Sequence, residues 1–152
     1  MYLKTHIVIT LFVVLLILPF FDHKMAFVII ALIATLIPDI DTKHSRIGKY
    51  KIFRPLQFFF SHRGPTHSLV FLILICLLLI LWNFAFAVAF FIGFGLHLIV
   101  DSCTIMGIYV FWPLKKRFFW KIRTGGIIEN FVFSIFLAAD IVLILSKIFC
   151  VF

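Results

Sequence analysis

The sequence predicts an all-α integral membrane protein, built as a single domain over residues 1–152 with about five transmembrane helices. Hydrophobic residues make up 64% of the chain, charged residues only 13%, and 22 residues are phenylalanine. The mean hydropathy of +1.24 lies far outside the range of a soluble domain. Long apolar tracts alternate with short polar segments, as expected of membrane helices joined by loops.

The positive charges gather in two segments. Of the 14 Lys and Arg residues, six lie in residues 43–63 and five in residues 115–123. Short loops rich in Lys and Arg remain on the cytoplasmic side of a membrane, where anionic headgroups attract them. This distribution accounts for the net charge of +8 without nucleic acid as a partner. With five crossings and both segments on the cytoplasmic side, the N-terminus is expected to be cytoplasmic as well.

The first helix is expected over residues 2–21. Lys4 followed by an apolar run is also typical of a signal peptide, but no small-residue cleavage site follows, so we expect a retained helix. After a polar turn at residues 22–24, a second apolar tract covers residues 25–37 and ends in Pro38-Asp39-Ile40-Asp41. Such a tract makes about 20 Å of helix, short of a hydrocarbon core of about 30 Å. The two aspartates are therefore expected below the headgroups, inside the protein.

Residues 42–60 form a basic, aromatic segment that is expected to lie along the membrane interface. The octet Ser61-His62-Arg63-Gly64-Pro65-Thr66-His67-Ser68 follows it and places two histidines and an arginine next to a strongly apolar tract. Residues 69–100 carry no formal charge apart from any on His97. A single helix over residues 67–101 would measure about 51 Å, too long for one crossing. A helical hairpin that turns near Trp82-Asn83 is the better solution.

Residues 102–126 are again basic and aromatic. Two aromatic segments, residues 109–112 and 118–122, flank Pro113-Leu114-Lys115-Lys116, a pattern that predicts a small β-hairpin at the interface. The last helix is expected over residues 127–149. With it, the predicted architecture consists of the membrane helices and the short interfacial segments that connect them.

This topology brings polar side chains from five helices to the cytoplasmic end of the bundle. These residues are His6, Asp39, Asp41, His62, His67, His97, Asp101 and Glu129. Ionisable residues at membrane depth are costly, so a functional interpretation is the default. Asp140 is set apart, because it lies deep in the last helix and the sequence identifies no partner for it.

The donor set of these residues suits a metal centre. Imidazole and carboxylate groups without thiolates favour zinc, manganese or iron over magnesium, and the three cysteines are scattered along the chain. His97 and Asp101, spaced i and i+4, share one helix face. Pro38 and the Gly64-Pro65 break would let neighbouring ligands turn toward one ion. The donors exceed the needs of one ion, so one or two divalent ions are predicted, zinc first, with an aspartate bridging two ions roughly 3.5–4 Å apart.

Each of these residues also has a purely structural interpretation. His97 and Asp101 could form a buried hydrogen-bonded pair, and Asp39 and Asp41 could end a helix. His6 could be an interfacial histidine, while a carboxylate in a first helical turn complements the helix dipole. The convergence of all of them at one depth favours a shared site.

Three segments carry a resemblance to a known family. Pro38-Asp39-Ile40-Asp41, the octet of residues 61–68 and Gly95-Leu96-His97-Leu98-Ile99-Val100-Asp101 resemble the signature of the YdjM-like inner-membrane metal-dependent hydrolases. The early His6 and the late Glu129 fit the same pattern, so the resemblance extends over most of the chain. It implies a metal-dependent hydrolase of the inner membrane and leaves the substrate open.

The expected function is hydrolysis of a lipid or lipid-linked phosphoester by metal-activated water at the cytoplasmic interface. The predicted metal ligands are His6, Asp39, Asp41, His62, His67, His97 and Asp101. Glu129 is the predicted general acid or base, and Arg63 is expected to bind an anionic group of the substrate. Because the site lies beneath a basic, aromatic rim, the expected partners are membrane lipids and an amphiphilic phosphate substrate. The sequence does not indicate an oligomeric state.

Two other functions compete with a hydrolase. A transporter or ion-coupled membrane protein would use the histidines and aspartates to bind or relay a metal or a proton. A permeation path needs polar residues through the outer half of the helices, where the sequence has only Asn83, Ser134, Asp140 and Ser146. A membrane adaptor with a structural metal would need a site closed to water.

Overall fold

A computed structural model describes residues 1–41, 48–54, 65–114 and 116–149, except for the side chain of Phe53. The α-helices are α1 (Leu3–Ile17), α2 (Lys24–Leu36), α4 (Leu69–Ile80), α5 (Phe84–Ser102) and α6 (Ile127–Phe149). Short 3-10 helices lie at η1 (Leu18–Phe20), η2 (Pro38–Asp41), η3 (Lys51–Phe53) and η4 (Pro65–His67). The described part of the chain contains no β-strand, so the predicted all-α class is confirmed.

Local chemistry explains where several helices begin and end. Pro19 lies in the first turn of η1, where α1 gives way to the tighter helix, because proline cannot donate to the α-helical ladder. The Ser68 side chain accepts a hydrogen bond from the Phe71 amide and caps α4. The turn between α4 and α5 occupies residues 81–83, and the Asn83 side chain caps α5 by accepting from the Ala85 amide at 2.8 Å.

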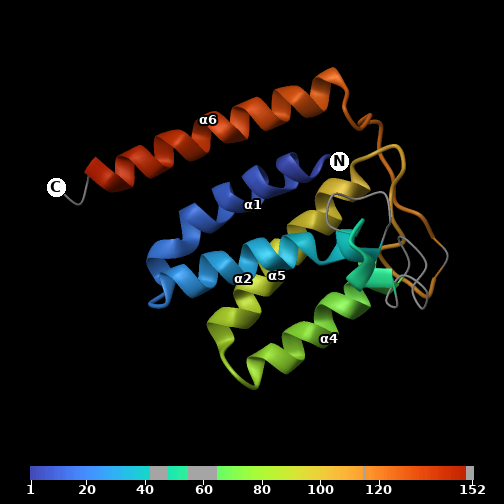
Figure 1. The fold of residues 1–152 in the computed structure, drawn as a ribbon, viewed down its shortest axis with the longest axis horizontal. Coiled ribbons are helices and arrows are strands. Elements are labelled where there is room, and N and C mark those ends of the chain that lie inside the picture. The colour runs from blue at the N-terminus through green and yellow to red at the C-terminus, as the bar shows by residue number, and fades with distance from the viewer. Residues whose placement is uncertain (42–47, 55–64, 115, 150–152) are drawn as a thin grey trace.

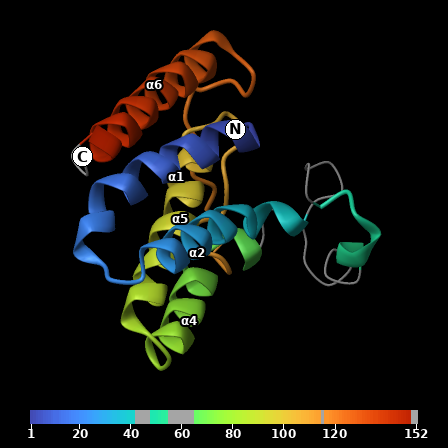
Figure 2. The ribbon, with the colours of Figure 1, turned by 60° about the vertical axis from the view of Figure 1, so that its left-hand side comes forward.

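Helix α5 lies at the centre of the bundle and packs against α1, α2 and α4. Its closest neighbour is α2, because a Cβ atom on Gly93 would lie only 2.0 Å from the Ala31 carbonyl oxygen. Thr35 of α2 joins this contact to α1, since its hydroxyl lies 3.0 Å from that of Thr10 and donates to the Ala31 carbonyl. Helix α6 covers the outer side of α1 and runs beside it (Figures 1 and 2).

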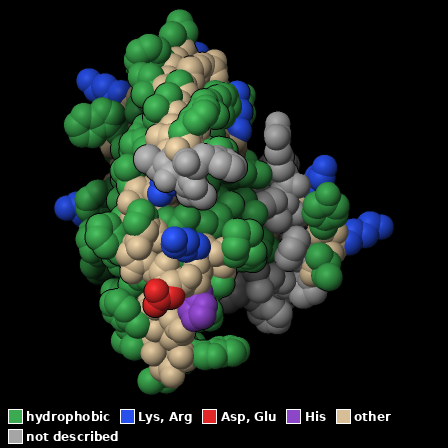
Figure 3. All heavy atoms as spheres, turned by 90° about the vertical axis from the view of Figure 1, so that its left-hand side faces the viewer, with side chains coloured by type: hydrophobic (Ala, Val, Ile, Leu, Met, Phe, Trp, Pro, Cys, Tyr) green, Lys and Arg blue, Asp and Glu red, His purple; other side chains and the backbone are tan. Residues whose placement is uncertain are grey.

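Within the described residues, three helices are long and apolar enough to cross a membrane: Leu3–Phe20, Phe84–Ser102 and Ile127–Phe149. Helices α2 and α4 have 13 and 12 residues. At 1.5 Å per residue they measure about 20 Å and 18 Å, less than the hydrocarbon core. The expectation of about five crossings is therefore not confirmed. Hydrophobic side chains predominate on the face of the molecule in Figure 3, and charged side chains are scattered there, as expected of a protein surrounded by lipid.

The predicted β-hairpin is also not confirmed. Ile108 and Phe118 form an isolated antiparallel bridge, with both backbone amides donating to the opposite carbonyl at 2.9 Å. A second isolated bridge joins Thr104 and Ile122 in parallel. In the basic, aromatic segment after α5, isolated backbone bridges therefore take the place of the predicted hairpin strands.

The order of the helices positions the site. The start of α1, the η2 turn after α2, the η4 turn before α4, the end of α5 and the start of α6 all lie at one end of the bundle (Figure 1). Each helix therefore contributes its polar terminus to the same level.

The close approach of α2 and α5 leads to a stability test. Gly93→Ala should destabilise the protein by roughly 1–3 kcal/mol, because the added methyl group would collide with the Ala31 carbonyl. Thermal unfolding of purified protein in detergent would measure the change. Gly95→Ala is the matched control, since a Cβ atom there meets Leu72 Cδ2 at 3.8 Å, an ordinary contact. Equal melting temperatures for the two variants would contradict the packing.

Candidate metal centre

His97 and Asp101 lie one turn apart on α5, and both are buried. His97 Nδ1 is 2.8 Å from the Thr35 carbonyl oxygen, which can only accept a hydrogen bond. Nδ1 must therefore carry the proton, and in the neutral ring the lone pair is on Nε2. That nitrogen is buried and has no hydrogen-bond partner among the described residues. A backbone carbonyl that orients an imidazole in this way is the usual support of a metal-binding histidine.

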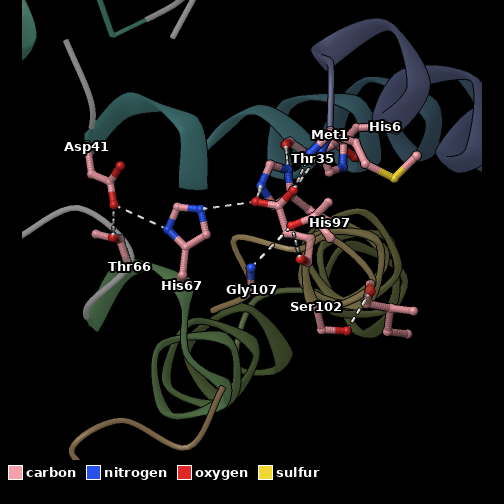
Figure 4. Close-up of polar contacts among 12 residues, drawn as sticks. Met1, His6, Thr35, Asp41, Thr66, His67, His97, Ser102 and Gly107 are labelled. Carbon is pink, nitrogen blue, oxygen red and sulfur yellow. Dashed lines mark hydrogen bonds and ion pairs between the residues drawn. The ribbon is translucent and has the colours of Figure 1, made fainter. Parts of the chain in front are cut away.

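His67 is oriented by a carboxylate instead. Asp41 Oδ2 lies 3.2 Å from His67 Nδ1 and accepts a hydrogen bond of 2.5 Å from the Thr66 hydroxyl. Figure 4 shows these three side chains together, with the ring of His67 between Asp41 and the rest of the cluster. The other ring nitrogen, Nε2, is 3.9 Å from Asp101 Oδ2. Asp41 therefore orients the His67 ring through Nδ1, on the side opposite to Asp101.

His6 reaches the cluster from α1. Its ring stacks on that of His97, with centroids 4.1 Å apart and 13° between the planes. His6 Nε2 is 3.3 Å from Asp101 Oδ1, and His6 Nδ1 has no hydrogen-bond partner in the described part of the chain. The Met1 amino group lies 2.6 Å from the same carboxylate oxygen. Asp101 Oδ1 thus already faces a positive charge.

Two groups of side chains, within the residues that the structure describes, have the geometry to hold a metal ion. His6, His97 and Asp101 form one, and Asp39, His67 and His97 form the other, with the ligand atoms of each group within 4.8 Å of one another. His97 belongs to both groups but has one available nitrogen, so it can bind one ion. Asp101 Oδ1 faces His6, whereas Oδ2 is 3.8 Å from His97 Nε2. Asp101 therefore presents an oxygen to each of these two histidines and would help them to hold one divalent ion.

The donor chemistry of the cluster fits a divalent cation. A buried polar atom without a hydrogen bond costs roughly 1–3 kcal/mol. His6 and His97 each present such a nitrogen here, counting partners in the described ranges. A metal ion held by the cluster would give His97 Nε2 a partner, and a set of imidazoles and carboxylates is typical of zinc, manganese and iron sites.

Asp39 is the partly exposed member of the cluster, whereas the side chains of His6, His67, His97 and Asp101 are buried. Burial raises the pKa of the Asp39 carboxyl above its ordinary value, although the neighbouring His6 opposes the rise. Asp39 is therefore the member of the two metal groups that keeps some contact with solvent.

Glu129 lies at the same end of the bundle but outside both groups. Its Oε1 accepts hydrogen bonds from the Tyr2 amide at 2.5 Å and the Thr5 hydroxyl at 2.9 Å, and its Oε2 accepts from the Gly125 amide at 2.6 Å. These contacts join the start of α6 to the start of α1. The structure therefore gives Glu129 an anchoring position, and its predicted role as an acid or base stays untested.

The remaining candidate residues, and Asp140, which the sequence set apart, lie outside the two metal groups or outside the described residues. His62 and Arg63 lie outside the described residues. Asp41 is in contact with His67 and belongs to neither metal group. Asp140 is buried in α6, and its carboxylate oxygens have no hydrogen-bond partner within the described ranges.

Sequence reasoning missed the groups that orient the ligands. The Thr35 carbonyl orients His97, and the Thr66 hydroxyl binds Asp41. Thr66 directly precedes His67, so its position in the octet was a usable signal. A backbone carbonyl has no signature in a sequence.

Comparisons with known proteins bear on the whole chain. A model of the YdjM inner membrane protein family matches residues 1–151. The chain is 31% identical over 108 residues to the uncharacterized protein YvsG of Bacillus subtilis, across 67% of this chain and 68% of YvsG. It is 32% identical over 114 residues to the inner membrane protein YdjM of Escherichia coli, across 67% of this chain and 58% of that protein. YdjM of Shigella flexneri matches to the same extent. The chain thus spans little more than half the length of the YdjM proteins, and no solved structure matches it.

The contact between Asp41 and His67 can be tested by metal affinity. Asp41→Ala should weaken metal binding roughly 10–100-fold, because His67 loses the carboxylate that orients its ring. Titration of the metal-free protein with zinc would measure the effect. Asp22→Ala, which removes an exposed carboxylate after η1, should bind zinc as the wild type does. An unchanged affinity in Asp41→Ala would remove Asp41 from the site.

The anchoring position of Glu129 predicts a different outcome. Glu129→Gln should lower the melting temperature, because an amide NH2 would replace an oxygen that accepts hydrogen bonds, at a cost of about 1.5–3 kcal/mol. Zinc content per chain should stay at the wild-type value. Asn130→Ala, at an exposed neighbouring position, is the control for stability. Loss of zinc in Glu129→Gln without loss of stability would identify Glu129 as a ligand.

Proposed function

This chain belongs to the YdjM inner membrane protein family, and on that premise we propose that it is a membrane-bound, metal-dependent hydrolase. The proposal extends to a lipid or lipid-linked phosphoester as the substrate class and to the cytoplasmic interface as the place of reaction. The single observation that carries it is the buried cluster of His6, His67, His97 and Asp101. Within this cluster, His6 and His97 each have a ring nitrogen without a hydrogen-bond partner among the described residues.

The chain's own residues have distinct roles in this proposal. Thr35 and Asp41 hold the rings of His97 and His67 with one nitrogen of each directed into the cluster. Asp101 presents one oxygen to His6 and the other to His97. A divalent metal bound by these groups supplies Lewis-acid activation of water near neutral pH.

The substrate would approach from the side of Asp39, the partly exposed member of the cluster. Arg63 and His62 keep their predicted roles in binding phosphate and metal, and both lie outside the described residues. The positive-inside rule supports the proposed cytoplasmic orientation, because 11 of the 14 Lys and Arg residues lie in residues 43–63 and 115–123. An amphiphile whose phosphate lies at headgroup level would meet the cluster directly.

One observation favours a second candidate, a membrane adaptor with a structural metal. The exposed fraction of His6, His67, His97 and Asp101 is at most 4%. Structural metal sites are closed to water, whereas catalytic sites keep an open coordination position. The transporter alternative has less support, because the histidines and aspartates of the two metal groups lie together at one end of the described bundle. Activity therefore has to be measured.

The decisive experiment is a hydrolysis screen of lipid phosphates in detergent, with a chelator control. Purified protein should contain one or two divalent ions per chain and release phosphate or a phosphorylated headgroup. His67→Ala and Asp101→Ala should each lose metal together with at least about 100-fold of the activity, because each removes a ligand. Val142→Ala, at an exposed position of α6, should retain both.

The outcomes separate the candidates. Bound metal without hydrolysis of any lipid phosphate would favour the adaptor. Wild-type protein that binds no divalent metal would refute both the hydrolase and the adaptor.

A further inference from the structure

An apolar groove of about 460 Å³ lies along α5 on the side away from the metal cluster. Gly95, Ile99 and Ser102 line it, and their spacing of four and three residues places them on one helix face. His97 and Asp101 point to the opposite face, because each residue advances a helix by about 100°. The groove is therefore a separate feature from the proposed site of hydrolysis.

The side chains that line the groove are almost all apolar. Leu69 and Leu72 of α4 form one side, and Phe91 and Ile99 of α5 form the other. Ser102 is the hydroxyl residue in the lining, and its hydroxyl already donates to the Ile99 carbonyl at 2.6 Å. A ligand that fits such walls is an alkyl chain.

The length and position of the groove match one leaflet of a membrane. It extends along α5 from Phe91 to Ser102, which corresponds to about 16 Å at 1.5 Å per residue. Half of a hydrocarbon core is about 15 Å. Ser102 ends α5 at the same end of the bundle as the metal cluster, so the Phe91 end of the groove would lie near the bilayer centre.

Positively charged side chains lie near the Ser102 end of the groove, which would face the lipid headgroups. Phe118 lines the groove there, and the Lys116 ammonium lies 5.8 Å from the centre of its ring. The next residue, Arg117, places its guanidinium 5.3 Å from the Phe119 ring and donates to the Ile105 carbonyl at 3.1 Å. An apolar channel with positive charge at one end complements an anionic amphiphile.

We propose that this groove binds one acyl chain of an anionic membrane phospholipid, whose phosphate lies against Lys116 and Arg117. A second copy of the chain is a poorer occupant, because its net charge of +8 offers no compensation for these cations. The bound lipid is distinct from the substrate of the proposed hydrolase, since α5 itself separates the groove from His97 and Asp101.

Gly95 provides the test of the apolar part. A Cβ atom there would meet Leu72 Cδ2 at 3.8 Å, an ordinary contact, and Gly95 lines the groove. Gly95→Phe is therefore expected to place its ring in the groove. Native mass spectrometry of the full chain, delipidated in detergent and mixed with phosphatidylglycerol, would count the bound lipids. Wild type should retain one lipid, and Gly95→Phe should need at least tenfold more lipid for the same occupancy. Val70→Phe, which adds the same ring at an exposed position of α4 outside the groove, should behave as the wild type does.

The charged end has its own test. Lys116→Gln combined with Arg117→Gln should weaken retention of phosphatidylglycerol and remove any preference for it over phosphatidylcholine. Melting temperature and metal content should remain unchanged in all these variants, which separates failure of the lipid site from failure of the metal centre.

Two results would overturn the proposal. One is equal lipid retention in wild type and Gly95→Phe. The other is a wild-type dimer, detected by mass, that Gly95→Phe converts to a monomer, since the groove would then hold a second copy.

Discussion

The hydrogen bond between His97 and the Thr35 carbonyl is the contact on which the arrangement of the site depends. It requires α2 and α5 to lie very close together, which Gly93 permits by having no side chain against Ala31. Thr35 also bonds Thr10, so the same residue that orients the imidazole holds α1 to α2. Helix packing and ligand orientation therefore depend on each other in this protein. The buried imidazole of His97 needs a polar partner, and the backbone of the closely packed α2 supplies it.

Asp101 contacts the other ring nitrogen of His97 and joins several segments of the chain. Its carboxylate meets His6, His67 and His97, which come from three separate segments of the chain. In an apolar bundle such a carboxylate cannot stay uncompensated. The contacts that compensate the Asp101 carboxylate therefore bring the ends of α1, η4 and α5 together. Glu129 joins α6 to α1 by accepting hydrogen bonds from the Tyr2 amide and the Thr5 hydroxyl.

Much of the fold could be predicted from the sequence. The apolar tracts indicated the membrane helices, and the alternation of tracts with polar segments placed His6, Asp39, His67, His97 and Asp101 at one end of the bundle. Span lengths were less predictable, because α2 and α4 stop short of a hydrocarbon core although their tracts are strongly apolar. The hairpin expected after α5 depended on β-propensity alone, and isolated bridges are found there instead.

What the sequence by itself determined was the class of protein, the order of its helices and the level at which its polar residues lie, since these follow from hydropathy, periodicity and charge along one dimension. Only the tertiary structure decided which donors face one another. Asp39 and Asp41 are alike in the sequence, yet Asp39 lies in a metal group and Asp41 orients His67. The apolar groove along α5 could not be predicted from the sequence either, because its walls come from α1, α4, α5 and the segment after α5. The direction of a side chain depends on the packing of neighbouring helices, which no local pattern encodes.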